Sequence, residues 1–288
     1  MRKTFIIICI LAIVLFSLAG CAKKEETSEF KIVTSFYPMY IIALNITDGA
    51  QNVRLENMTD TNVGCLHDYT LKTSDLVKLE DADVFIVNGL GIETFADKVL
   101  QTNNKVSVIE ASKNITNLIQ DSDETNAHVW LDIDNYIIQV EEVAEGLEKA
   151  NPENASVYEE NKIKYVETLN NLKTELEGNK SSGVQEAISF SDSLSYLENT
   201  MNMKLLTIEN DHEQSSLSAE KLKDVIDYAK QNNITKVIVD NQTSDKNANT
   251  VASEIGAKVY VLDSFLSGPM QKDAYEIMMR QNAKLMEE

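Results

Sequence analysis

The chain alternates between short runs of β-branched residues and longer stretches in which apolar residues recur at helical period. In its first half this pattern predicts strands at residues 31–34, 53–56, 84–87 and 106–109, with helices at 37–47, 74–79 and 92–100. The same order returns in the second half. There the predicted strands are 185–190, 204–206, 235–239 and 258–262, and the predicted helices are 192–200, 219–231, 247–255 and 271–286. Each half therefore predicts a lobe with a parallel sheet covered by helices.

The stretch between the two lobes is almost purely helical, from residue 135 to residue 177. It breaks at Asn151-Pro152, where proline suits the first turn of a new helix. A helix over 152–177 would be close to 40 Å long at ~1.5 Å per residue. We therefore expect an α/β protein with two βα lobes, at 31–134 and 181–288, joined by a long rigid helical connection at 135–180.

The first 21 residues have the pattern of an export signal. Arg2 and Lys3 precede an apolar run over residues 5–18, and Leu18-Ala19-Gly20-Cys21 follows it. This ending resembles the lipobox of bacterial lipoproteins, which implies a signal peptide at 1–20, lipidation of Cys21 and a polar tether at 21–30. A plain secretory signal cut nearby, or an uncleaved anchor, is the alternative.

Charge and cysteine content narrow the class of protein further. The net charge is −20, and loss of the two cations of the signal makes it −22. Such acidity argues against nucleic acid or anionic lipid as a partner, and it raises the local concentration of cations. Cys9 leaves with the signal and Cys21 is expected in thioether linkage, which leaves Cys65 without a disulfide partner. We therefore expect the exported fold to depend on its hydrophobic core.

Two of the three histidines lie in similar polar and aromatic settings. They are His67, in Cys65-Leu66-His67-Asp68-Tyr69, and His128, in His128-Val129-Trp130-Leu131-Asp132. Imidazole is a common ligand of zinc-like ions, and a neighbouring carboxylate often accepts a hydrogen bond from its other nitrogen. Asp68 and Asp132 could supply such a carboxylate. These residues predict a metal site, whereas two buried structural histidines are the alternative.

The order of several motifs resembles one known family, the zinc- and manganese-binding receptors of bacterial ABC importers (cluster A-I solute-binding lipoproteins). The resemblance covers nearly the whole mature chain. The matching segments are Val33 to Tyr40, His67-Asp68-Tyr69, Asn88 to Glu93, His128 to Asp132, Asp263-Ser264, and Tyr275 to Asn282.

The resemblance implies a binding site in the cleft between the lobes. Carried over by position, His67, His128 and Asp263 are its metal ligands. The cargo would be Zn2+, or alternatively Mn2+, delivered to an ABC permease from the outer face of the bacterial cytoplasmic membrane, where the lipid holds the protein. We expect a monomer that is not an enzyme.

The fourth ligand position departs from the family pattern. Members carry histidine or glutamate there, whereas this chain has Ser191. A neutral hydroxyl is a poor ligand beside imidazole or carboxylate. A water could complete the shell, and Cys65, His212 and Asp192 are alternative donors. Because Ser191 matches neither ligand set, zinc and manganese stay open, although a Cys65 thiolate would favour zinc.

Two other functions are consistent with these residues. The first is a degenerate family member that acts as an adhesin or binds another solute. The second is a zinc hydrolase with an open fourth position, or a triad built from Ser191, a histidine and Asp263. The sequence contains no His-Glu-x-x-His and no Gly-x-Ser-x-Gly, which disfavours the enzyme.

Overall fold

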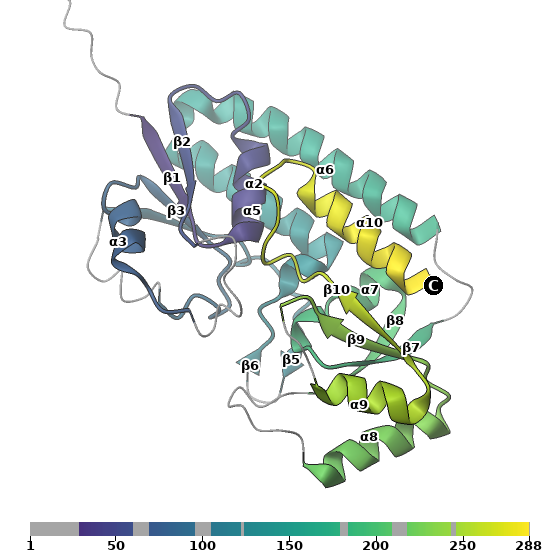
Figure 1. Ribbon diagram of the computed structural model, residues 1–288. Helices are drawn as coiled ribbons and strands as arrows, with labels where there is room; N and C mark the ends of the chain where they lie inside the picture. The colour runs from purple at the N-terminus through teal and green to yellow at the C-terminus, as the bar shows by residue number, and fades with distance from the viewer. Residues whose placement is uncertain are drawn as a thin grey trace, which may run out of the picture.

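Two four-stranded parallel sheets lie at opposite ends of the molecule, beside one long helix, in a computed structural model (Figure 1). The structure describes residues 29–59, 69–95, 105–121, 124–178, 184–208, 218–242 and 246–287. Within these ranges no helix has the length and apolar character needed to span a bilayer.

The first sheet has the strand order β2-β1-β3-β4. Its strands are β1 (Phe30–Thr34), β2 (Val53–Asn57), β3 (Val84–Val87) and β4 (Ser107–Glu110), and its first helices are α2 (Tyr37–Ile46) and α3 (Thr73–Glu80). Thr34 at the end of β1 is in register with Asn57 of β2 and Ile86 of β3, so the carboxyl ends of these strands lie at one edge.

The second sheet repeats this arrangement, with the order β8-β7-β9-β10. Its elements are β7 (Gln185–Ser189), α7 (Leu197–Met201), β8 (Met203–Thr207), α8 (Ala219–Gln231), β9 (Lys236–Asp240), α9 (Lys246–Ile255), β10 (Lys258–Leu262) and α10 (Ala274–Glu287). Ser189 lies beside Thr207 and Ile238, and Leu262 lies beside Asp240. Every predicted strand is confirmed to within one or two residues at either end.

The predicted helices at 92–100 and 192–200 differ most from the structure. Residues 92–95 form a turn, because the Glu93 carboxylate accepts hydrogen bonds from the backbone N–H groups of Asn88 and Gly89 and folds the segment back. Residues 96–100 lie outside the described ranges. Residues 192–194 form a 3-10 turn, and the α-helix begins only at Leu197.

The helical connection consists of α5 (Ile133–Ala150), a 3-10 turn at Pro152–Asn154, and α6 (Ala155–Gly178). Asp132 caps α5 through Oδ1, which accepts hydrogen bonds from the N–H groups of Asp134 (2.8 Å) and Asn135 (3.1 Å). Gly146 of α5 lies so close to Ile109 of β4 that an added Cβ would overlap the isoleucine side chain. The first half of the connection therefore packs on the first sheet.

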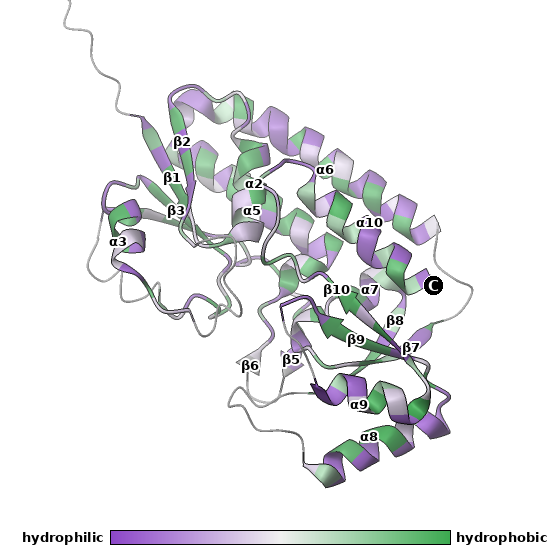
Figure 2. Ribbon diagram, viewed as in Figure 1, coloured by the Kyte–Doolittle hydropathy of each residue, from purple (hydrophilic) through white to green (hydrophobic). Residues whose placement is uncertain are grey.

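The 24-residue helix α6 runs along both lobes, as predicted (Figure 1). It contacts α2 and α5 of the first lobe and also α7 and α10. Its buried side chains belong to one continuous core that extends from Ile32 in β1 to Met286 in α10. A smaller core lies between the second sheet and helices α8 and α9, along which hydrophobic and hydrophilic residues alternate (Figure 2).

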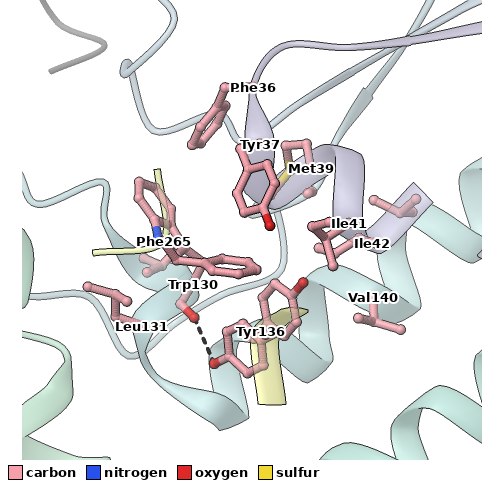
Figure 3. Packing of buried hydrophobic residues seen from close by; sticks show 14 of the residues in the cluster. Phe36, Tyr37, Met39, Ile41, Ile42, Trp130, Leu131, Tyr136, Val140 and Phe265 are labelled. Carbon is pink, nitrogen blue, oxygen red and sulfur yellow. Dashed lines mark hydrogen bonds between the residues drawn. The ribbon is translucent and has the colours of Figure 1, made fainter. Parts of the chain in front are cut away.

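Aromatic side chains fill the seam where the two lobes meet (Figure 3). Phe36 packs edge-on against Trp130 at a centroid distance of 5.1 Å, and Tyr37 packs against Phe265 at 5.0 Å. Tyr275 of α10 stacks on Tyr136 of α5 at 3.8 Å. These contacts fix the end of the chain against the first lobe, which matters because Asp263 lies just before Phe265.

Candidate metal site

His128 lies directly before the short 3-10 turn Val129–Leu131 and is only 5 % exposed. Its backbone N–H donates to Asn126 Oδ1 at 3.0 Å, and its ring Nδ1 lies 3.0 Å from the same oxygen. The imidazole is also 5.2 Å from the indole ring of Trp130, measured between centroids. Two neighbours in its own segment therefore define the position of the ring.

Asp263 follows the last residue of β10 and is partly buried. Its Oδ1 accepts a hydrogen bond from the N–H of Phe265 at 2.8 Å. The Asn282 side chain, from α10, bonds both backbone groups of Asp263: its Oδ1 accepts from N–H and its Nδ2 donates to C=O, each at 2.9 Å. Helix α10 thus holds the carboxylate at the end of its strand.

The surroundings of Asp263 favour a cation. Burial raises the pKa of the Asp263 carboxyl, and the charge of Asp240 raises it further, while hydrogen bonds from Phe265 and Asn241 act in the opposite direction. Burial, and secondarily the charge of Asp263, also raise the pKa of Tyr37 well above its usual range. A desolvated carboxylate beside a second carboxylate creates a negative potential that a bound cation would relieve.

Trp130 joins the segment of His128 to the segment of Asp263. Its Nε1–H donates to the carbonyl oxygen of Ser264 at 2.9 Å, and its own carbonyl accepts a hydrogen bond from the Tyr275 hydroxyl at 2.9 Å, drawn as the dashed line in Figure 3. One fully buried indole therefore contacts both segments that carry a candidate ligand.

A chain of hydroxyls connects Ser191 to a buried carboxylate in the second lobe. Ser191 Oγ lies 2.6 Å from Ser193 Oγ, and Ser193 Oγ donates to Asp240 Oδ2 at 2.7 Å. The carboxylate only accepts, so the single hydroxyl proton of Ser193 is used on Asp240. Ser191 must then donate its own proton to Ser193. This keeps the lone pairs of Ser191 Oγ for other partners and makes the oxygen a better electron donor than an isolated serine.

The turn at residues 88–93, which contains Gly89 and Gly91, lies next to the segment of His128. Glu93 Oε1 accepts hydrogen bonds from Ser35 Oγ at 2.8 Å and from Asn88 N–H at 2.7 Å, and Oε2 accepts from Gly89 N–H at 3.0 Å. Burial nevertheless raises the pKa of Glu93 to about 7. Asn88 Nδ2 donates to the carbonyl of Ala127 at 3.1 Å, so this turn contacts the residue just before His128.

The structure places four of the eight candidate residues. His128, Asp263, Ser191 and Asp192 are described, whereas Cys21, Cys65, His67 and His212 lie outside the described residues. In the described part of the chain, no three histidine, cysteine, aspartate or glutamate side chains form a group that could hold a metal ion. His67, the predicted partner of His128, is among the residues that lie outside the described ranges.

Sequence analysis missed several residues that surround the candidate ligands. Asn126 contacts His128 and also donates from Nδ2 to the carbonyl of Asp192 at 2.9 Å. Ser193 and Asp240 extend the hydroxyl chain. Asn126 and Ser193 lie two residues from a candidate ligand, which is a usable signal, but no local pattern connects Asp240 to Ser193, 47 residues away.

Comparison with known structures defines the class of protein. A solved structure of ZnuA superposes with a TM-score of 0.78 at 28 % identity, over 90 % of this chain and 99 % of the other. Two parallel α/β lobes beside a long helix are thus the architecture of a ZnuA-type solute-binding protein, and the predicted fold class is confirmed.

The sequence comparisons give the family. The sequence model described as ZnuA, zinc-uptake complex component A, periplasmic, matches residues 32–288, and the chain belongs to this family. It is 27 % identical to the zinc-binding lipoprotein AdcA of Streptococcus pneumoniae, over 86 % of this chain and 52 % of AdcA. It is 32 % identical to the manganese-binding lipoprotein MntA of Halalkalibacterium halodurans, over 60 % of this chain and 58 % of MntA. The chain therefore spans between half and three fifths of the length of these two relatives.

Proposed function

We propose that this chain captures a divalent transition metal, zinc in preference to manganese, at the seam between its lobes, and delivers it to an ABC permease. One observation carries the proposal: in a member of the zinc-uptake family, Trp130 contacts both the segment of His128 and the segment of Asp263. An imidazole nitrogen and a partly buried carboxylate oxygen are donors that zinc prefers.

The ligand set in this proposal combines both lobes. His67 and His128 supply nitrogen, Asp263 supplies oxygen, and Ser191 or a water completes the shell. Binding involves no chemical reaction, because delivery requires the ion to leave unchanged. Lipidation at Cys21 would hold the protein at the outer face of the membrane, next to its permease.

Metal-dependent thermal stability tests the proposal directly. The protein without residues 1–21, stripped of metal, would be titrated with zinc and with manganese beside His67→Ala, His128→Ala and Asp263→Asn. An ion that binds only the folded state adds about 2.7 kcal/mol at 100 times Kd. We expect zinc to give the larger shift and each variant to lose it. No shift with either ion would contradict metal capture and favour a family member with another ligand.

The three alternative donors can be ranked in the same titration. Cys65→Ser, His212→Ala and Asp192→Asn each remove one of them. A variant that binds as the native protein does excludes its residue from the ligand shell. If Cys65→Ser alone weakens zinc and leaves manganese unaffected, the thiolate is the fourth ligand and Ser191 is not.

Capture should weaken as pH falls, because a protonated imidazole cannot bind a metal. Each ligating histidine reduces the affinity by up to about tenfold per pH unit once the pH is low enough to protonate its imidazole. An affinity that stays constant between about pH 7.5 and 5.5 would argue against histidine ligation.

A further inference from the structure

The side-chain amide of Asn126 contacts both lobes at once. Its Oδ1 accepts a hydrogen bond from the backbone N–H of His128 at 3.0 Å and lies 3.0 Å from Nδ1 of the same residue. Its Nδ2 donates to the carbonyl oxygen of Asp192 in the second lobe at 2.9 Å. Asn126 is only 5 % exposed, so water has little access to either end of the amide.

The two backbone partners decide the orientation of this amide. A backbone N–H only donates and a carbonyl oxygen only accepts, so the amide oxygen must face His128 and the amide nitrogen must face Asp192. An amide oxygen cannot donate to the ring, so Nδ1 of His128 carries the hydrogen. In the neutral imidazole Nε2 then has no hydrogen, and its lone pair is the one that binds a metal.

A second contact clamps the same two segments together. The Tyr196 hydroxyl, from the second lobe, donates to the backbone carbonyl of Asn126 at 3.0 Å and accepts from the N–H of Ile119 at 2.9 Å. Asn126 N–H in turn donates to the carbonyl of Ile119 at 2.9 Å. Tyr196 is 1 % exposed. The segment that begins at Ser191 is thus held against the segment that leads to His128.

We propose that Asn126 is a positioning residue of the metal site: it holds His128 in the Nδ1–H tautomer and ties that ring to the second-lobe segment of Ser191 and Asp192. The effect of Asn126 on zinc affinity rests on the proposed metal capture. Its effect on the tautomer of His128 does not depend on that proposal. Partners that orient a ligating histidine typically contribute 10–100-fold to metal affinity. We expect a loss in that range when the amide is removed.

Nuclear magnetic resonance of protein labelled with 15N-histidine reads the tautomer, because the chain has only three imidazoles to resolve. The His128 signals are those that vanish in His128→Gln. At pH 8 without metal, we expect the Nδ1–H form in the native protein. Asn126→Leu removes both contacts of the amide, and we expect it to release the ring to the Nε2–H form and to lower zinc affinity, measured by chelator competition, by about 10–100-fold.

Two further variants separate positioning from general stability. Asn126→Asp keeps an oxygen that accepts from His128 but places a second oxygen against the Asp192 carbonyl, so it should retain the native tautomer and lose the contact between lobes. Asn199→Leu is the matched control, because Asn199 Nδ2 donates to Asp132 Oδ2 at 3.1 Å and so also links the lobes, but through the Asp132 carboxylate and not through the His128 backbone and ring. We expect it to keep the native tautomer and zinc affinity.

Three results would overturn the inference. The first is a native His128 in the Nε2–H form, and the second is a native tautomer in Asn126→Leu. The third is an equal loss of zinc affinity in Asn199→Leu. If Asn126→Leu does not fold, Asn126→Ala removes the same contacts without adding a branched side chain. A native protein that binds no zinc would defeat the proposed function, while the tautomers would still decide the role of Asn126.

Discussion

The two sheets share one strand order, yet the side chains at their carboxyl ends differ in kind. The first sheet carries amides and a buried glutamate there, which include Asn57, Asn88 and Glu93, beside the buried hydroxyls of Thr34 and Ser35. The second ends in hydroxyls and aspartates, which include Ser189, Asp240 and Asp263. The same strand order therefore brings two chemically different sets of side chains to the seam where the lobes meet.

The difference indicates a division of roles. The carboxyl ends of the strands form the first edge in the first sheet and the second edge in the second sheet. At the first edge, polar groups bond mainly to one another: Gln139 Nε2 donates to Asn88 Oδ1 at 2.7 Å and to Ser112 Oγ at 2.9 Å, and Asn88 donates to Ala127. Such a buried network fixes positions. At the second edge, Asp240 and Asp263 supply negative charge. We infer that the first lobe orients the histidine nitrogen and the second lobe attracts the cation.

Removing the Trp130 side chain, which connects the segments of His128 and Asp263, should have the largest effect on stability. Trp130→Ala deletes a fully buried indole and its hydrogen bond to Ser264, so we expect the free energy of unfolding to fall by about 3–5 kcal/mol. Urea denaturation measures this. Trp130→Phe, which keeps a ring against Phe36 but leaves the Ser264 carbonyl without its donor, should cost about 1–3 kcal/mol. If Trp130→Ala is as stable as the native protein, contacts other than those of Trp130 hold the carboxyl edges of the two sheets together.

The buried glutamate gives the first edge its own pH dependence. The folded state raises the pKa of Glu93 from 4.5 to about 7, so it holds a proton that the unfolded chain releases in this window. The contribution of Glu93 to stability is therefore fully present below pH 4.5 and falls as pH rises to 7, by up to about 3 kcal/mol. Glu93→Gln cannot ionise and should lack this decline.

Urea denaturation of both proteins at pH 5 and pH 8 checks this sign. The stability of the native protein relative to Glu93→Gln should be lower at pH 8 than at pH 5. If that difference is the same at both pH values, or larger at pH 8, the three hydrogen bonds to the carboxylate outweigh its burial and Glu93 is ionised throughout.

The amide network should respond to the loss of a single member. Gln139→Leu keeps a similar volume but leaves Asn88 Oδ1 and Ser112 Oγ without their shared donor, so we expect a loss of about 1–3 kcal/mol. Asn170→Leu is a matched control, because Asn170 is an exposed residue of α6 whose Nδ2 donates within its own helix, to the carbonyl of Val166. A Gln139→Leu variant as stable as this control would mean that the network does not fix the first edge.

Local pattern was sufficient for the strands and for α6, because burial on one face of a strand or helix leaves a periodic signal. It failed at residues 92–95, where contacts of Glu93 with backbone N–H groups override the helical pattern. It also gave no indication that α5 packs on the first sheet. His128 was predicted as a ligand from its polar and aromatic setting and Asp263 from the family resemblance, and both stay predictions. The link from Asn126 to Asp192 depends on the packing of the lobes and has no trace in either segment alone.

The smallest effect is expected on zinc affinity when the chain of hydroxyls at the carboxyl edge of the second sheet is broken. This change tests whether these hydroxyls contribute to metal binding. Suppose that Ser191 is the fourth donor and that its bond to Ser193, which is bonded to Asp240, makes its oxygen a better ligand. Ser193→Ala should then lower zinc affinity by about two- to tenfold, because one hydrogen bond contributes ~0.5–1.5 kcal/mol. Ser191→Ala should lose at least as much, and Ser195→Ala, which removes another buried hydroxyl from the same segment, should lose nothing. If Ser191→Ala binds zinc as the native protein does, the fourth donor is a water or one of Cys65, His212 and Asp192. The carboxylates of the second edge would then attract the cation through their charge alone, and the hydroxyl chain would serve only to keep Asp240 bonded inside the lobe.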